Sequence, residues 1–451
     1  MDLVGRRVLV VGLARTGLAV ARFLKAKGAV VSATEMRSRE EMGEGVAGME
    51  GMDIPVEWGG HRVETFLQQD LIVVSPGVDL DLEPLQRAMK KGIQVISEIE
   101  LAYQFIHIPI IGITGTNGKT TTTLLVGELL KEAGRKVGVG GNVGEPLILF
   151  AEGGDQWEIL AAEISSFQLE AIETFRPRWS ILINVTEDHL DRYASYAQYI
   201  DAKARIFMNQ TPEDIAILNR DDPIVMKLAE TAKSRKVFFS LKKKLERGAF
   251  YDGRSIILRL NGEEEDYSLE KVPLKGIHNV ENMMAALLTA RLSGCTQEAA
   301  KIVLNRFKGL EHRLEFVREV GGIRFYDDSK GTNVGSVVRS LESFVEPVIL
   351  IAGGKDKGGD LSPLKEGIRG HVRQMILIGE AKERMAKDLG GLTETTMAGT
   401  LEEAVGQAFR TANKGDIVLL SPACSSFDMF KDYKERGRVF KETVRRLQEA
   451  H

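Results

Sequence analysis

The sequence predicts an α/β protein of three domains, each built on a mostly parallel sheet. The chain has 451 residues, which suits two to four domains of ordinary size. Apolar runs typical of strands alternate with helical patterns in three successive stretches, and most of the runs end at a Gly- or Ser-rich loop. We place the domains at residues 1–105, 106–309 and 310–451.

The first domain opens with RVLVVGLARTGLAVARFLKAKGAVVSATE at residues 7–35, which predicts strand, glycine turn, helix and strand. Its strands are continuous apolar runs, as expected of parallel strands that are buried on both faces. Further strands are predicted within residues 70–78 and 94–101. We expect a Rossmann-like unit whose ligand groups lie at the carboxyl ends of the strands.

The second domain starts at HIPIIGITGTNGKT, residues 107–120, where an apolar run leads into a glycine loop and a helical pattern. More strand-like runs follow, at residues 136–144, 158–170 and 178–193. Residues 249–269 contain DG and NG turns and predict an antiparallel excursion. Residues 277–294 predict an amphipathic helix. The whole resembles the mostly parallel sheet of a P-loop ATPase.

The third domain repeats the pattern of an apolar strand followed by a Gly- or Ser-rich loop. It does so in IRFYDDSKGTN, PVILIAGGKDKG, QMILIGE and DIVLLSPACSSFDMF, residues 323–333, 347–358, 374–380 and 416–430. This pattern predicts a second Rossmann-like unit, again with ligand groups after the strands.

The composition excludes several classes of protein. A net charge of -4 indicates no bulk attraction to nucleic acid or an anionic membrane. Two distant cysteines, Cys295 and Cys424, exclude a disulfide framework and a Cys-rich zinc site. No apolar stretch reaches membrane-spanning length, and the start lacks a signal-peptide pattern. We expect a cytoplasmic monomer that neither enters a membrane nor binds nucleic acid.

The loop in the second domain predicts phosphate binding. It is shorter than the common G-x-x-x-x-G-K-[ST] pattern, but its glycines let backbone amides turn toward an anion, and a helix begins directly after it. A simple glycine turn with a capping threonine is the alternative. The strand before it, the helix after it and the GKT triplet together favour phosphate binding. We expect ATP in contact with Gly115, Thr116, Asn117, Gly118, Lys119, Thr120 and Thr121.

TGTNGKTTT resembles the Mur ligases and the related folylpolyglutamate synthetases. The latter lack an N-terminal nucleotide domain, so the Mur ligases match the whole chain better. The motifs DDSKGTNVGS, GGKDKGGDLSPL and LLSPACSSFDMFKDYKERG are similar to those of the Mur ligases that add D-glutamate. The resemblance implies an ATP-dependent amide ligase that takes UDP-N-acetylmuramoyl-L-alanine and D-glutamate. Another Mur ligase or a folylpolyglutamate-synthetase-like ligase is the alternative.

The resemblance also implies roles for residues around the phosphate loop. We expect two Mg²⁺ ions, with Thr120, Glu163, His189 and Lys203 as their ligands. Lys203 would bind as a carbamate. Catalytic roles are implied for Lys119, Glu163, His189, Lys203 and Lys330. Asn279 and Asn282 are expected at the adenine, Arg313 and Lys330 at the phosphates, and Asp328 at the ribose. Taken singly, each could be an ordinary structural or surface residue.

The N-terminal glycine loop is the main departure from a dinucleotide fingerprint. GLARTG has Ala14 at the position of the middle glycine, although Glu35 lies where an acidic group would hold a ribose. A nicotinamide-dependent dehydrogenase is therefore a weak rival, as is a non-catalytic nucleotide-binding regulator. We expect the uridine nucleotide substrate on Gly12, Leu13, Ala14, Arg15, Thr16, Glu35, Ser75, Pro76, Gly77, Asn142, Ser165 and Gln168.

The third domain offers groups for an amino acid with two carboxylates. A buried carboxylate needs a cation and hydroxyl or amide donors, because an unpaired buried charge is costly. Loops after the apolar strands supply such groups. We predict that D-glutamate contacts Thr332, Lys357, Ser426, Phe427 and Tyr433.

Overall fold

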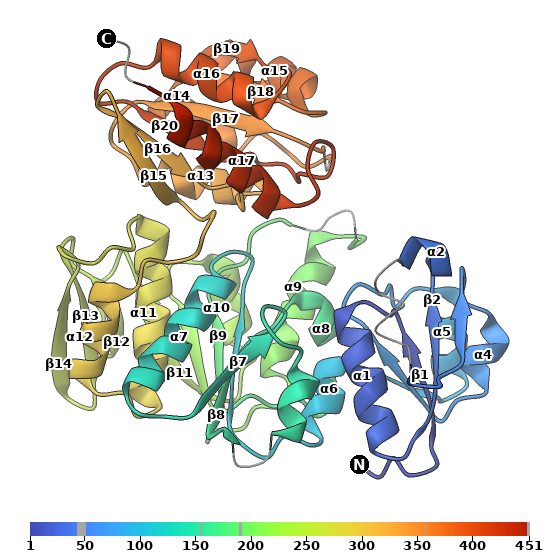
Figure 1. Ribbon diagram of the computed structural model, residues 1–451. Coiled ribbons are helices and arrows are strands. Elements are labelled where there is room, and N and C mark those ends of the chain that lie inside the picture. Colours follow the sequence, from blue (N-terminus) through green and yellow to red (C-terminus); the bar gives the residue numbers. More distant parts are fainter. Residues whose placement is uncertain (43–50, 154–155, 189–191, 357, 449–451) are drawn as a thin grey trace.

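The computed structural model describes residues 1–42, 51–153, 156–188, 192–356 and 358–448. Their strands form three separate sheets of five, nine and six strands. Figure 1 shows the N-terminal unit on the right, the central unit on the left and the C-terminal unit above. The predicted three-domain α/β fold is confirmed, and the domain boundaries after residues 105 and 309 stay predictions.

The N-terminal sheet is parallel throughout, in the order β3-β2-β1-β4-β5. The strand order reverses between β1 and β4, so the loops after these two strands flank the crevice where such sheets bind ligands. The strands are β1 (Arg7–Val11), β2 (Val30–Glu35), β3 (Val56–Trp58), β4 (Leu71–Val74) and β5 (Gln94–Ser97). The helices are α1 (Arg15–Ala26), α2 (Arg39–Met42), α4 (Val63–Leu67), α5 (Glu83–Lys90) and α6 (Glu98–Tyr103).

The strand predicted over residues 94–101 is wrong in its second half, because α6 begins at Glu98. The alternation of acidic and apolar residues in SEIEL mimics a strand. Both acidic side chains are instead buried against amides of the central domain. Glu98 Oε1 accepts from the Ile148 amide (2.7 Å), and Glu100 Oε2 accepts from the Phe175 amide (2.8 Å).

The central sheet has the order β14-β13-β12-β11-β10-β9-β6-β8-β7. It is parallel except for the antiparallel pairs β12–β13 and β13–β14, which confirm the predicted excursion. Its strands are β6 (Ile110–Thr114), β7 (Val137–Gly141), β8 (Ile159–Glu163), β9 (Trp179–Leu182), β10 (Ile215–Asn219), β11 (Arg235–Ser240), β12 (Gly248–Tyr251), β13 (Ser255–Leu260) and β14 (Glu263–Ser268).

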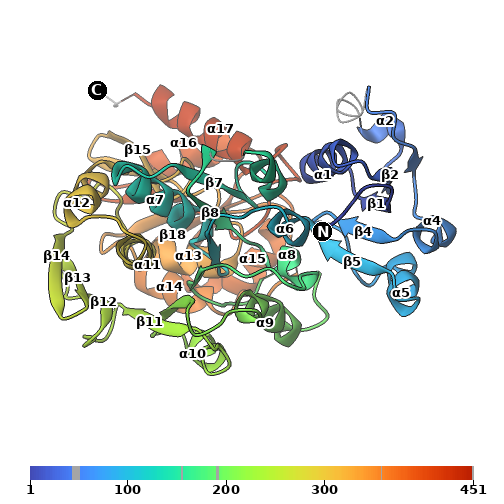
Figure 2. The same cartoon turned by 90° about the horizontal axis from the view of Figure 1, so that it is seen from below.

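Helices cover this sheet on both faces. They are α7 (Lys119–Glu132), α8 (Ser166–Glu170), α9 (Tyr196–Ala204), α10 (Pro223–Ala229), α11 (Ile277–Leu292) and α12 (Gln297–Arg306), with 3₁₀ turns η1 (Leu147–Glu152) and η3 (Arg205–Phe207). The prediction that α11 is amphipathic is wrong, since every residue from Asn279 to Ala290 is buried. Figures 1 and 2 show why: α11 lies between α7, the sheet and the C-terminal unit.

The C-terminal sheet has the order β15-β16-β20-β17-β18-β19, with only β15 antiparallel to its neighbour. The strands are β15 (Glu315–Val320), β16 (Ile323–Asp327), β17 (Val348–Gly353), β18 (Val372–Ile378), β19 (Glu394–Met397) and β20 (Ile417–Leu420). The helices are α13 (Val334–Leu341), α14 (Leu364–His371), α15 (Lys382–Leu389), α16 (Leu401–Thr411) and α17 (Tyr433–Arg446), with a 3₁₀ turn η4 (Gly390–Leu392). Among the described residues, no helix combines the length and apolar character needed to cross a bilayer.

Candidate functional site

The phosphate loop joins β6 to α7. Gly118 precedes the helix with φ +88°, and a Cβ there would collide with Asn282 Oδ1, so only glycine fits without strain. The first amides of α7 have no acceptor within the helix and carry its positive end. The first amides of α7 are therefore the backbone donors that this loop would offer to an anion, and phosphate binding by the loop stays a prediction.

Two lysines converge on one backbone oxygen of this loop. The carbonyl of Gly115 accepts from Lys119 Nζ (2.9 Å) and from Lys203 Nζ (2.8 Å), and Lys119 also donates to the Thr116 carbonyl (2.8 Å). Burial lowers the pKa of Lys119, against the opposing pull of Glu163. The sequence pattern predicts Lys119 at the phosphates, and only the resemblance associates Lys203 with this loop, so the roles of both lysines stay predictions.

Lys203 lies deep in the protein, with 1% of its surface exposed. Its Nζ lies 4.5 Å from the centroid of the Tyr199 ring. Burial, and then the charge of Lys119, hold the pKa of Lys203 well below its usual value. The lowered pKa favours the neutral amine, which is the form of lysine that can react with CO₂.

Glu163 ends β8 next to the loop and is buried. Its Oε1 accepts from Asn142 Nδ2 (2.7 Å), while its Oε2 is buried with no hydrogen-bond partner among the described residues. A buried carboxylate oxygen left in this state fits a metal ligand, because hard cations take such oxygens. Thr120 is buried in the first turn of α7, and His189 lies outside the described residues.

Asn279 and Asn282 lie together on α11. Asn282 Nδ2 donates to Asn279 Oδ1 (3.1 Å), and Asn279 Nδ2 donates to the Lys275 carbonyl (2.7 Å). The two amides thus orient each other, with Asn282 directed at Gly118. This arrangement leaves Asn282 lining the pocket next to the loop.

The C-terminal domain adds three charged groups. Asp328 Oδ2 accepts from Ser340 Oγ (2.8 Å) and Ser421 Oγ (2.6 Å), and burial raises the pKa of Asp328 to about 6. Arg313 has a buried Nε without a hydrogen-bond partner among the described residues. Burial and the charge of Arg313 lower the pKa of Lys330 to about 8.

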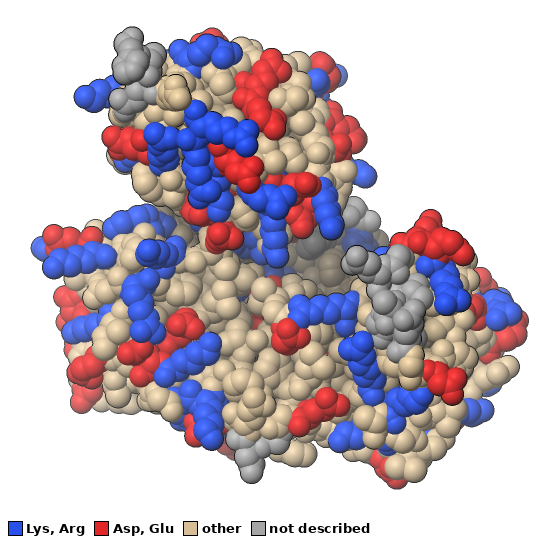
Figure 3. Space-filling view, in the orientation of Figure 1, with Lys and Arg blue, Asp and Glu red and all other residues tan. Residues whose placement is uncertain are grey.

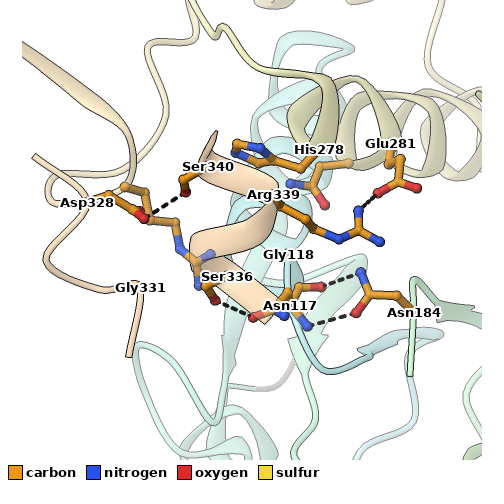
Figure 4. A pocket seen from close by; sticks show the side chains of 12 residues that line it. Asn117, Gly118, Asn184, His278, Glu281, Asp328, Gly331, Ser336, Arg339 and Ser340 are labelled. Carbon is orange, nitrogen blue, oxygen red and sulfur yellow. Dashed lines mark hydrogen bonds and ion pairs between the residues drawn. The ribbon is translucent and has the colours of Figure 1, made fainter. Parts of the chain in front are cut away.

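A narrow pocket lies where the central and C-terminal domains meet (Figure 4). The central domain lines it with Asn117, Gly118, Asn184, His278, Glu281 and Asn282, and the C-terminal domain with Arg313, Asp328, Gly331, Ser336, Arg339 and Ser340. Its volume is about 30 Å³. Figure 3 shows the larger hollow between the three units, with Lys and Arg side chains on the rim of the C-terminal unit.

Several residues around this pocket were missed in the sequence. Asn184 clasps the loop, since its Oδ1 accepts from the Asn117 amide (2.9 Å) and its Nδ2 donates to the Asn117 carbonyl (3.2 Å). Asp188 accepts from Asn333 Nδ2 (3.1 Å) across the domain boundary. Both follow β9 in INVTED, and the carboxyl end of a strand next to β6 was the available signal. The sequence around Glu281 and Arg339 contains no comparable signal.

The N-terminal loop is held by its own side chains. Glu35 Oε2 accepts from the Leu13 amide (2.7 Å) and Glu35 Oε1 from Arg37 Nε (2.9 Å), while Ser75 Oγ donates to the Gly12 carbonyl (2.8 Å). The predicted neighbours Ala14, Thr16, Pro76 and Gly77 lie in these same two loops and the start of α1. The structure thus brings together the loops after β1 and β4, as the strand order requires.

Other residues that we predict at the uridine nucleotide form hydrogen bonds or ion pairs with other parts of the protein. Arg15 donates to the Gly144 carbonyl (2.7 Å) and pairs with Glu145, both in the central domain. Ser165 and Gln168 form a capping box at the start of α8. These side chains line the boundary between the first two domains, but each already has a protein partner.

The residues predicted for D-glutamate are only partly gathered. Lys330 Nζ lies 5.0 Å from the centroid of the Tyr433 ring, and Thr332 follows in the same loop. Ser426 is buried, whereas Phe427 is 68% exposed. Lys357 lies outside the described residues.

A further carboxylate and histidine group lies away from the loop. His312, Glu315 and Asp327 place ligand atoms within 4.8 Å of one another. Lys441 Nζ donates to both oxygens of Glu315 (3.1 and 3.2 Å), and His312 Nδ1 lies 2.6 Å from Asp327 Oδ2. Because the protein itself supplies these partners, the group fits an anchor for the chain segment between the domains.

Three family models match successive parts of the chain. Residues 6–97 match the N-terminal domain described as Mur ligase MurD-like, and residues 113–290 match the Mur ligase middle domain. Residues 312–424 match the Mur ligase glutamate ligase domain. The order of the three matches follows the order of the three sheets.

Whole-length relatives carry one description. The UDP-N-acetylmuramoylalanine--D-glutamate ligase of Geotalea daltonii is 54% identical over 447 residues, covering 99% of each chain. That of Geotalea uraniireducens is 53% identical over 450 residues, covering 100% of this chain and 99% of the relative.

Solved structures share the fold at low identity. A pseudomurein peptide ligase type C from Methanothermus fervidus has a TM-score of 0.60 at 20% identity, covering 98% of this chain and 99% of that one. The UDP-N-acetylmuramate-alanine ligase of Thermotoga maritima has a TM-score of 0.57 at 18% identity, covering 98% and 99%. With relatives about half identical along the entire length, this chain belongs to the UDP-N-acetylmuramoylalanine--D-glutamate ligases of the Mur ligase family.

Proposed function

We propose that this protein joins D-glutamate to the L-alanyl carboxylate of UDP-N-acetylmuramoyl-L-alanine, with ATP converted to ADP and phosphate. The step belongs to the cytoplasmic synthesis of peptidoglycan precursors. The choice of substrates is supported by the relatives' shared description. The observation that carries the chemistry is the meeting of Lys119 and Lys203 at the Gly115 carbonyl.

The reaction needs activation of a carboxylate. A carboxylate is a poor electrophile, because an oxide ion would have to leave. An oxygen of the L-alanyl carboxylate attacks the γ-phosphorus of ATP, ADP leaves, and an acyl phosphate forms. The amine of D-glutamate then attacks the acyl carbon, loses a proton, and expels phosphate as the amide bond forms.

The first step brings two anions together, so the site has to offset their repulsion. Lys119 and the first amides of α7 face the loop where the phosphates bind. Arg313 lines the pocket from the C-terminal domain, and the charges of Arg313 and Lys119 both act on Lys330, so cations of the two domains lie near one another. Fixed charges in a water-poor site stabilise such a transition state far better than charges in water.

The residues present fit Mg²⁺. The family resemblance implies two ions. Glu163 Oε2 is the buried oxygen without a partner among the described residues, and Thr120 offers a hydroxyl. Lys203 as a carbamate, and His189, would complete the ligands. Bound there, Mg²⁺ neutralises phosphate charge. Glu163 and Asn142 hold the adjoining strand ends in place through their hydrogen bond.

The carbamate on Lys203 can be tested without relying on activity alone. Protein equilibrated with ¹³C-bicarbonate is expected to show a carbamate carbon signal that Lys203→Ala lacks. The variant should be nearly inactive, and acetate should restore part of the activity by supplying the lost oxygens. An alanine variant with normal activity would make Lys203 a structural residue.

The two remaining substrates are assigned to the other domains. We place the uridine nucleotide at the loops after β1 and β4, with Asn142, Ser165 and Gln168 across the boundary. We place D-glutamate with Thr332, Lys357, Ser426 and Tyr433, and Phe427 at its edge. Lys357→Ala should raise the KM for D-glutamate about tenfold and leave the KM for ATP unchanged, which is the loss expected of one charged contact.

The proposed function is tested by phosphate release from ATP with each substrate omitted in turn. Release should require UDP-N-acetylmuramoyl-L-alanine and D-glutamate together, and L-glutamate, L-lysine and diaminopimelate should not replace D-glutamate. Sustained release with another amino acid would assign the chain to a different ligase activity. Reduction of a nicotinamide cofactor would indicate the rival dehydrogenase.

A further inference from the structure

Helix α13 rests one face on the central domain. Asn333, its N-cap, donates to Asp188 (3.1 Å), and Ser336 Oγ donates to Asn117 Oδ1 (2.9 Å) in the phosphate loop. Arg339 pairs with Glu281 of α11, and Ser343 follows on the same side. Steps of three or four residues place these side chains along one side of a helix. The helix therefore spans the pocket from the phosphate loop to α11.

The Glu281–Arg339 ion pair links α11 to α13 along one side of the pocket (Figure 4). Glu281 is buried, and its second oxygen accepts from Asn219 Nδ2 (3.2 Å). Breaking a buried pair on one side is costly, because the charge that remains loses its partner. The pair is thus well suited to hold the two domains together.

The volume inside the closed contact is too small for a nucleotide. The pocket holds about 30 Å³, room for a few waters at most. Sites for small molecules usually span roughly 300–1,000 Å³. Arg339 and Glu281 line the pocket together with Asn117, Gly118 and Asn282, the groups to which we assign ATP. In this arrangement the pocket does not hold a whole nucleotide, so we expect α13 to move away from α11 when ATP binds.

We propose that the Glu281–Arg339 pair is a gate on the nucleotide pocket, and that ATP opens it by competing with Glu281 for Arg339. The proposal rests on the assignment of ATP to this pocket. The phosphates of ATP are strong acceptors for a guanidinium, so Arg339 exchanges a carboxylate for a phosphate and is never left unpaired. Glu281 keeps the bond from Asn219.

Two features make the exchange physically reasonable. Burial raises the pKa of Glu281, against the opposing pull of Arg339, so the carboxylate can take up a proton once the guanidinium leaves and need not stay as an unpaired buried charge. Arg339 is also only partly buried, with its side chain 26% exposed, so it can swing without passing through a packed core. The pair therefore consists of a buried carboxylate and a more accessible guanidinium, and the guanidinium is the group that moves.

The test is the affinity for ADP and ATP of the full-length protein, measured by calorimetry in wild type and in Glu281→Gln. The glutamine keeps the size and the bond from Asn219 but removes the competing charge. We expect the Kd for ADP to fall about three- to tenfold. The matched control is Glu265→Gln, which removes the carboxylate paired with Arg291 on the same helix, away from the pocket, and should leave the Kd unchanged.

Arg339→Ala separates the two halves of the proposal and serves if Glu281→Gln does not fold. It removes the gate and the phosphate partner together, so its Kd should not fall below that of wild type, and adding Glu281→Gln to it should change nothing further. Unchanged or weaker ADP binding in a folded Glu281→Gln protein overturns the gate. Tighter binding in Arg339→Ala overturns the exchange with phosphate. A wild type that binds neither nucleotide instead overturns the proposed function.

Discussion

The loops after β1 and after β6 have the same architecture and different chemistry. Both follow a buried parallel strand, turn at a glycine with positive φ and lead into a helix. In the N-terminal loop, a carboxylate of Glu35 takes the Leu13 amide. In the central loop, the side chain at the start of the helix is Lys119, folded back over the loop. The N-terminal loop therefore has a carboxylate bonded to one of its amides, whereas the central loop has an ammonium group bonded to its carbonyls.

The difference shows that glycine spacing alone does not define a phosphate site. A carboxylate already bonded to a loop amide repels a phosphate there, so the N-terminal loop suits a sugar or a base better at that point. The central loop keeps its first helical amides and the Lys119 side chain for an anion. The residues between and after the glycines decide which ligand the common fold can take.

The largest effect is expected from removing the cation that distinguishes the central loop. Lys119→Ala should lower kcat about a hundredfold or more, because a fixed charge at the phosphates is lost. The measurement is phosphate release by the variant, after circular dichroism has shown that its fold is unchanged. Activity within a few-fold of wild type would remove the contrast between the two loops.

A pair of glycine substitutions should affect the loops separately. Gly118→Ala puts a Cβ against Asn282 at a positive φ, and should raise the KM for ATP about tenfold. Gly17→Ala puts a Cβ against the Gly12 carbonyl, and should raise the KM for the uridine nucleotide by a similar factor. Each variant should leave the other substrate's KM unchanged, and an identical response to both would contradict two separate sites.

A smaller effect is expected from pH. The pKa of Lys330 is lowered to about 8, so the ammonium is charged below that pH and neutral above it. Because the charge attracts phosphates, kcat/KM for ATP should fall several-fold as the pH rises through about 8. Lys330→Arg should shift this fall to higher pH, since arginine stays charged. A profile that Lys330→Arg leaves unchanged would assign the titration to another group.

The smallest effect is expected at the carboxylate of the N-terminal loop. Glu35→Gln retains one acceptor oxygen for the three N–H donors of Leu13 and Arg37, and should raise the KM for the uridine nucleotide about threefold. The KM for ATP should not change. Stronger binding of the uridine nucleotide would show that the Glu35 charge opposes its pyrophosphate.

The sequence predicted the elements that depend on local pattern. The order of strands and helices, the glycine loops and the antiparallel excursion follow from periodicity and turn residues, and the structure has them. The errors arose where a distant partner decides. The pattern of α6 predicts a strand, because the sequence does not show that Glu98 bonds to the central domain. Helix α11 is buried because the C-terminal domain covers the face that would otherwise be exposed to solvent.

The same limit applies to the site. The pattern GTNGKT points to Lys119 by itself. Arg15, which we expect at a nucleotide, pairs with Glu145, 130 residues away, and the sequence pattern does not show that partner. Glu281 lies in the interior of a predicted helix, where a charge is normally assigned to the exposed face. Only the placement of α13 opposite gives it a partner.

The central claim is that the site converts the L-alanyl carboxylate to an acyl phosphate at the phosphate loop. UDP-N-acetylmuramoyl-L-alanine labelled with ¹⁸O in both oxygens of that carboxylate tests it directly. The carboxylate oxygen that attacks phosphorus departs with the phosphate, so each phosphate released in a turnover with D-glutamate should carry one ¹⁸O by mass spectrometry. Phosphate without ¹⁸O would mean that ATP is cleaved by water, and would contradict the proposed mechanism.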